Sequence, residues 1–175
     1  MLGEEHAERK NDHFTSSQAY LLRIVYDILN ERLKEINVSN NFALFILGIF
    51  ETSIKAVDFH TPGQSTLPTN TPSIDALGYS LTILRDACAQ GNSSIAEEVV
   101  NTLVNKGFLD LLLSLLSELE LPSSIRKTVK QNEGEMVNSE LPKVCLYKGF
   151  RRDIVAVIGY CLYVRKRIQD EIRQK

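Results

Sequence analysis

The segment from Ser94 to Leu119 constrains the fold more than any other part of this 175-residue chain. Apolar residues recur at helical spacing from Ile95 to Val104, the turn Asn-Lys-Gly ends at Gly107, and the run FLDLLLSLLSEL follows at once. Apolar residues three and four positions apart lie on one side of an α-helix. A glycine lets the chain reverse tightly between two closely packed helices. The pattern predicts two such helices, with the leucine-rich second one buried on more than one side.

The same periodicity predicts helices along most of the chain. A first helix is expected to begin at Thr15, Ser16 or Ser17, whose hydroxyls can cap free N–H groups. Six residues are expected to form its apolar face: Leu21, Ile24, Val25, Ile28, Leu29 and Leu33. The run 37–41 (NVSNN) is expected to end this helix and to cap the next.

Four further helices are predicted from similar signals. One runs from about Phe42 to Phe59, and its first half is apolar nearly all round, which predicts burial on several sides. A loop rich in proline spans residues 60–72. The next helix begins near Ser73, and its apolar stripe is expected to contain Leu77, Leu81, Leu84 and Cys88. A last pair is expected from Gly149 to Arg165 and from Ile168 onward.

Composition and charge exclude several classes of protein. Hydrophobic residues make up 43% of the chain and charged residues 24%, which is ordinary for a globular protein with a sizeable core. The net charge of -2 provides no field that would attract nucleic acid or an anionic membrane. The longest nearly apolar run, Phe42 to Phe50, is far shorter than the ~20 residues that span a bilayer. We therefore expect no membrane association and regard nucleic acid as an unlikely partner class.

The cysteines and the N-terminus favour the cytoplasm. Cys88, Cys145 and Cys161 are odd in number and scattered, which argues against a disulfide framework. Reduced thiols are typical of the cytosol or nucleus. The first 13 residues are polar and lack the apolar stretch of a signal peptide. A cytoplasmic location is expected.

No residue pattern points to catalysis or to a cofactor. His6, His13 and His60 share no zinc-type spacing with a cysteine. The sequence contains no glycine-rich phosphate loop and no G-x-S-x-G elbow. Cys161 lies on an apolar stripe, which is typical of a buried small side chain and not of a nucleophile. The chain is expected to be no enzyme and to need neither metal nor cofactor.

The helix order resembles that of an armadillo repeat. The short helix, the glycine turn and the leucine-rich helix match the first two helices of such a repeat, and residues 149–163 match the third. The apolar stripe of that third helix consists of Phe150, Ile154, Val157, Ile158, Cys161 and Leu162. The predicted fold class is all-α, an armadillo-like helical repeat (a fragment of an α-solenoid). A helical bundle gives similar stripes and stays open from periodicity alone.

Residues 147–172 carry a more specific resemblance. They read YKGFRRDIVAVIGYCLYVRKRIQDEI and resemble the start of the C-terminal domain of the ataxin-10 family. The resemblance implies an armadillo-like fold and a cytoplasmic scaffold without enzymatic activity, associated with cell division, cell survival and partner binding. Tyr160 and Val164 depart from the family, which usually has asparagine and arginine there. An asparagine amide can clamp a peptide backbone with one donor and one acceptor, and a phenol cannot do so in the same geometry.

This reading divides the chain into four parts. Residues 1–14 are expected to be disordered, 15–119 to form armadillo-like helices, and 120–146 to be a flexible insertion with a short helix near Ile125–Lys130. Residues 147–175 are expected to be the start of the ataxin-10 domain, cut short because the family domain continues for several more helices.

Basic residues gather near the C-terminus, and three interpretations compete. The residues are Lys148, Arg151, Arg152, Arg165, Lys166, Arg167 and Arg173. They form a solvated face beside acidic helical neighbours, a surface for an acidic partner, or a nucleic-acid site. The residues expected to contact a partner protein are Tyr147, Lys148, Arg151, Arg152, Tyr160 and Arg165.

The predicted function is that of a non-catalytic interaction or scaffold protein of the ataxin-10 type. Its partners would be other proteins, with possible self-association through the open end of the repeat. Two alternatives remain: a truncated fragment without independent function, and a helical nucleic-acid-binding protein.

Overall fold

A computed structural model describes residues 13–32, 35–90, 94–120, 142–163, 165, 169–170 and 173. Within these residues the protein is all-α, as predicted, and contains no β-strand beyond one isolated bridge between Leu119 and Lys143. The helices are α1 (Ser16–Glu31), α2 (Asn40–Ala56), α3 (Pro72–Ala89), α4 (Ser94–Asn105), α5 (Phe108–Glu118) and α7 (Phe150–Leu162).

The helix ends follow the signals in the sequence. Thr15 caps α1 with a full capping box, in which its hydroxyl accepts from the Gln18 N–H at 3.2 Å. Ser39 caps α2 by accepting from the Phe42 N–H. Gly107 precedes α5 at φ 83°, a left-handed conformation that glycine adopts without strain. The predicted tight reversal between α4 and α5 is therefore present.

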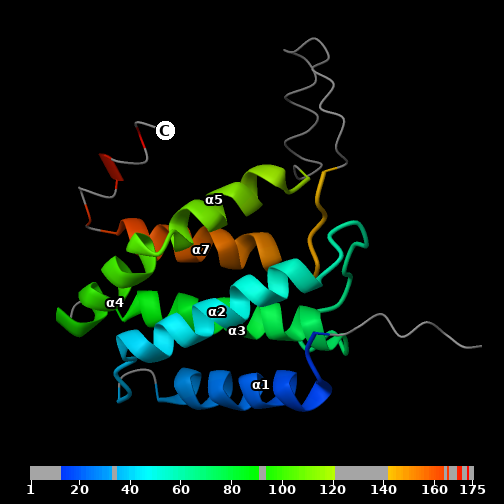
Figure 1. Cartoon of the computed structure of the whole chain (residues 1–175), viewed down its shortest axis with the longest axis horizontal. Coiled ribbons are helices and arrows are strands. Elements are labelled where there is room, and N and C mark those ends of the chain that lie inside the picture. Colours follow the sequence, from blue (N-terminus) through cyan, green and yellow to red (C-terminus); the bar gives the residue numbers. More distant parts are fainter. Residues whose placement is uncertain are drawn as a thin grey trace, which may run out of the picture.

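Helix α3 forms the centre of the molecule. It packs against α1 on one side and α7 on the other, and against α2 and α4 as well (Figure 1). Helix α2 packs on α3, and α5 packs on α7. In the contact between α3 and α7, the sulfur atoms of Cys88 and Cys161 lie 3.9 Å apart and both side chains are buried.

Burial of α3 is wider than its predicted stripe. Ser80 and Thr82 are buried along with the leucines of this helix. Their hydroxyls donate to carbonyl oxygens of the preceding turn, from Ser80 to Leu77 at 3.0 Å and from Thr82 to Tyr79 at 2.9 Å. Because the helix itself satisfies these hydroxyls, they can be buried without the cost of an unpaired polar group.

The predicted apolar face of α1 was wrong in part. Leu21, Ile24 and Ile28 are 60%, 37% and 47% exposed, whereas Leu22 and Leu29 are buried. Helix α1 packs mainly on one neighbour, α3, so only a narrow stripe of its apolar residues is covered.

The prediction that the first half of α2 is buried on several sides was also wrong. Phe45 is 64% exposed, while Ile46, Leu47 and Phe50 on the inner face are buried. Helix α2 covers α3 and touches α4, and its remaining face meets solvent.

Two connecting segments are tied to each other by their backbones. The N–H groups of Val144 and Lys148 donate to the carbonyls of Phe59 and Ser65 at 2.8 and 2.9 Å. This pairing anchors residues 142–148 beside the loop that precedes α3, and 142–146 of these belong to the expected flexible insertion. Residues 1–12 and 121–141, with the expected short helix, lie outside the described residues, as do most residues from 166 onward.

Candidate functional site

A groove runs across α1, α3 and α7. It consists of two adjoining hollows of about 290 and 320 Å³, which share Arg23, Pro68 and Tyr79 in their walls. We call it the α1–α3–α7 groove. The residues that line the hollow of about 290 Å³ are Arg23, Tyr26, Asp27, Thr66, Leu67, Pro68, Tyr79, Thr82, Arg85, Tyr147, Lys148, Arg152 and Asp153.

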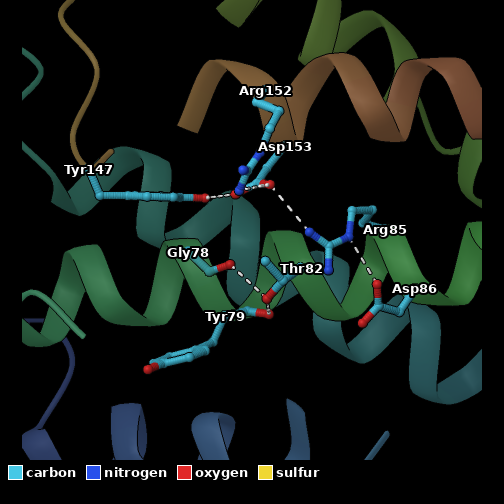
Figure 2. A network of polar contacts seen from close by, with 8 residues as sticks. All are labelled: Gly78, Tyr79, Thr82, Arg85, Asp86, Tyr147, Arg152 and Asp153. Carbon is cyan, nitrogen blue, oxygen red and sulfur yellow. Dashed lines mark hydrogen bonds and ion pairs between the residues drawn. The ribbon is translucent and has the colours of Figure 1, made fainter. Parts of the chain in front are cut away.

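A polar network centred on Asp153 forms the floor of the groove (Figure 2). The Tyr147 hydroxyl donates to Oδ2 of Asp153 at 3.0 Å, and Nη1 of Arg85 donates to Oδ1 at 3.2 Å. Nε of Arg85 donates to Oδ1 of Asp86 at 2.9 Å. Arg152 reaches the same Asp153 carboxylate from the solvent side, at 3.5 Å. One buried carboxylate therefore joins α3, α7 and the segment before α7.

The local sequence around Gly149 builds this floor. Gly149 has a φ of 111°, which glycine adopts readily and which turns the extended segment into α7. Phe150 then packs against the ring of Tyr147, with centroids 5.3 Å apart, and against Phe59 at 6.3 Å. The turn folds Tyr147 back under the first turn of α7, where its hydroxyl meets Asp153.

Burial and charge set the protonation of the floor. Burial raises the pKa of Tyr147 well above its ordinary value, and the neighbouring Asp153 charge raises it further. Burial also raises the pKa of Asp86, although Arg85 opposes this. Burial lowers the pKa of Arg85, but Asp86 and Asp153 outweigh it and the net pKa is raised. Near neutral pH the floor therefore holds a neutral phenol donor beside a permanent cation.

Each of the three helices contributes an Arg–Asp pair. Arg85 and Asp86 come from α3, and Arg152 and Asp153 from α7. On α1, Nε of Arg23 lies 3.8 Å from the Asp27 carboxylate, and both side chains are about half exposed. Tyr26 and Tyr79 also line the groove, and their ring centroids are 5.8 Å apart.

The structure separates the predicted contact residues. Lys148 and Arg152 line the groove and are exposed. Tyr147 is only 2% exposed, so its ring is part of the core. Arg151 points elsewhere and donates to the main-chain carbonyl of Glu120.

The other two predicted residues lie at the far end of α7. Nη1 of Arg165 donates to the carbonyls of Tyr160 at 2.8 Å and of Tyr163 at 3.3 Å, where it caps the helix. The Tyr160 side chain is 41% exposed. It lies seven residues, or about two turns, after Asp153, and therefore on the same side of α7.

Sequence reasoning missed the residues that α1 and α3 contribute to the groove. Arg23, Tyr26 and Asp27 recur at three- and four-residue spacing, as do Tyr79, Thr82 and Asp86. These are polar stripes beside the apolar ones. The signal was present, but it does not show that the two stripes face each other.

Other kinds of site are not found in the described part of the chain. No group of three His, Cys, Asp or Glu side chains there is placed to hold a metal ion. No single described helix is long and apolar enough to cross a membrane. Helices α4 and α5 reach that length and apolarity only when taken together, and they are bent by 64° relative to each other.

Comparisons with family models, with curated proteins and with solved structures find no match for this chain.

Proposed function

We propose that this protein is a non-catalytic, armadillo-like interaction protein of the ataxin-10 type, and that the α1–α3–α7 groove is its partner-binding face. The proposal rests on how the helices pack and on what lines the groove. The resemblance of residues 147–172 to the ataxin-10 family adds the expectation of a cytoplasmic role in cell division and survival.

The helix packing supports a repeat. In this proposal α4, α5 and α7 are the three helices of one unit, and α2 and α3 are the last two of the unit before it. Helix α2 packs on α3, α5 packs on α7, and α3 and α7 pack on each other. In a helical repeat each unit covers the apolar face of its neighbour in this way. On the other side of α3, α1 takes the place of the preceding third helix.

The groove is the observation that carries the function. Helices α1, α3 and α7, which pack side by side, present arginine, aspartate and tyrosine side chains to one hollowed face. Arginine supplies donors and the exposed carboxylate of Asp27 supplies acceptors, so together they can meet the carbonyl and N–H groups of a peptide backbone. The buried contacts of Arg85 with Asp86 and Asp153 hold this guanidinium in place before any partner arrives. Such preorganisation lowers the entropy lost on binding.

Paired charge reversals test the proposal. Lys148→Glu with Arg152→Glu reverses two exposed charges at the groove. Lys55→Glu with Lys106→Glu makes the same change at exposed positions outside the groove lining. Partners captured quantitatively from cells should include proteins that the groove variant loses and the control variant retains.

Identical partner sets for the wild type and both variants, with both variants folded by circular dichroism, would reject the groove as the binding face. The cellular role is tested separately by depletion and rescue. Cells lacking the protein should accumulate division defects that the wild type and the control correct and the groove variant does not. Normal division after complete depletion would remove the role in cytokinesis.

A further inference from the structure

The groove carries more cations than anions on its exposed rim. Its buried carboxylates are engaged within the protein: Asp153 in the network, and Asp75 through the N–H and hydroxyl of Thr69, at 2.6 and 2.8 Å. The exposed charged residues of the rim are Arg23, Lys148, Arg152 and Asp27. Three cations against one anion give the rim a net charge of +2, in a chain whose net charge is -2.

We propose that the groove takes an extended, acidic segment of a partner protein, with carboxylate side chains on Lys148 and Arg152. This inference rests on the proposed function and names the chemistry of the partner. A local charge opposite in sign to the rest of the chain steers a complementary ligand to that place.

The length of the groove fits an extended strand. Neighbouring helices pack about 8–10 Å apart, so a path across three helices covers about 20 Å. An extended chain advances about 3.3 Å per residue, and about six residues therefore cross the groove. Alternate side chains of such a segment point to the same side, which places every second residue over the rim.

Arg85 is placed to bind the main chain of the segment. A guanidinium has five N–H donors, and the two bonds to Asp86 and Asp153 use two of them. Its charge is already balanced by these carboxylates. A neutral carbonyl oxygen therefore suits the remaining donors better than another carboxylate does.

The floor disfavours a denser polyanion. A nucleic acid carries one phosphate charge per nucleotide, and its backbone would run over the carboxylates of Asp153 and Asp27. The cations on the rim lie at its α7 and α1 ends, not in a continuous stripe. Spaced carboxylates with neutral residues between them fit this pattern.

Fluorescence anisotropy with the full chain tests the inference. The probe is a fluorescein-labelled peptide of alternating glutamate and serine, and its matched control has glutamine in place of glutamate. The acidic peptide should bind at least about tenfold more tightly than the glutamine peptide, a difference of about 1.4 kcal/mol. Binding should weaken as salt is added, because the rim charges are exposed.

Variants locate the site. Lys148→Gln with Arg152→Gln should weaken binding of the acidic peptide by about tenfold or more, and Lys55→Gln with Lys106→Gln by less than about twofold. Equal binding by both variants, equal binding of the two peptides, or no binding of the acidic peptide would each overturn the inference. A single-stranded oligonucleotide that binds the same residues more tightly than the peptide would also overturn it, in favour of nucleic acid.

The two proposals fail in different ways. If the groove variant loses cellular partners but no acidic peptide binds, the groove is still the partner-binding face, and the inference that its partner is acidic is rejected. If the peptide binds through Lys148 and Arg152 but the variants keep every cellular partner, the groove has an acidic ligand and the proposed function falls.

Discussion

The α1 wall and the α3–α7 floor of the groove carry the same residue types in different surroundings. On the wall, Arg23 and Asp27 are about half exposed and lie 3.8 Å apart. On the floor, Asp153 is almost fully buried and accepts from Arg85 and Tyr147. Exposed ion pairs contribute little to stability, because water and salt screen them. Buried charges cost much to leave unpaired. We therefore expect substitutions on the floor that remove a buried partner to lower the free energy of unfolding more than substitutions on the wall.

The largest effect is expected at Asp153. Replacing it by alanine leaves the Tyr147 hydroxyl and Arg85 without their buried acceptor. We expect Asp153→Ala to lower the free energy of unfolding by about 3 kcal/mol. For a protein of this size, that corresponds to a fall in Tm of about 6–12 °C. Urea unfolding followed by circular dichroism measures it. A loss below about 1 kcal/mol would mean that the floor is no more dependent on its charges than the wall.

A smaller effect is expected for Tyr147→Phe, which removes one buried hydrogen bond and keeps the ring. The free energy of unfolding should fall by about 1 kcal/mol at neutral pH. Because the folded pKa of Tyr147 is raised, its contribution is complete below the unfolded value of about 10 and is lost as pH rises through the folded pKa. The variant should therefore lose less stability than the wild type in alkali. Parallel losses in the two proteins would contradict this.

Asp86→Asn tests a floor carboxylate whose charged form is disfavoured by burial. The folded pKa of Asp86 is raised, so this residue favours folding most below its unfolded pKa of about 3.9, and that contribution is lost as pH rises through the folded pKa. Asparagine still offers an acceptor to Arg85. At pH 7 the variant should match the wild type within about 0.5 kcal/mol or exceed it. Toward pH 4 the free energy of unfolding of the wild type should rise relative to that of the variant. Urea unfolding at the two pH values measures this difference. A large loss of stability at pH 7 would mean that the charge of Asp86 stabilises the fold, as we expect for Asp153.

The smallest effect is expected on the wall. Arg23→Ala and Asp27→Ala should each change the free energy of unfolding by less than about 0.5 kcal/mol, and added salt should reduce even this. The same urea titration serves as the control for the floor variants. An effect as large as that of Asp153→Ala would remove the distinction between the two regions.

Local signals in the sequence predicted the helices well. Thr15, Ser39 and Gly107 mark ends that the structure places within a residue or two of the expected positions. Which face of a helix is covered depends on how many neighbours it has, and periodicity does not report this. Leu21 and Phe45 are exposed for that reason, while the hydroxyl-rich α3 is buried.

The site was predicted only where it is local in sequence. Lys148 and Arg152 were expected at a surface and lie at one. Tyr147 was expected there too, but the turn at Gly149 folds it inward. Arg85 is 68 residues from Asp153, and only the packing of α3 on α7 brings them together.

The place of α7 beside α3 has a consequence for synthesis on the ribosome. Helix α3 ends at Ala89 and α7 begins at Phe150, so about 60 residues separate the two partners of this contact. At about 5–20 residues per second, translation takes roughly 3–12 s to supply them. During that interval nothing from α7 covers the side of α3 where Cys88 later meets Cys161. The nascent chain therefore offers a transient apolar site to ribosome-associated chaperones, and it disappears once α7 docks.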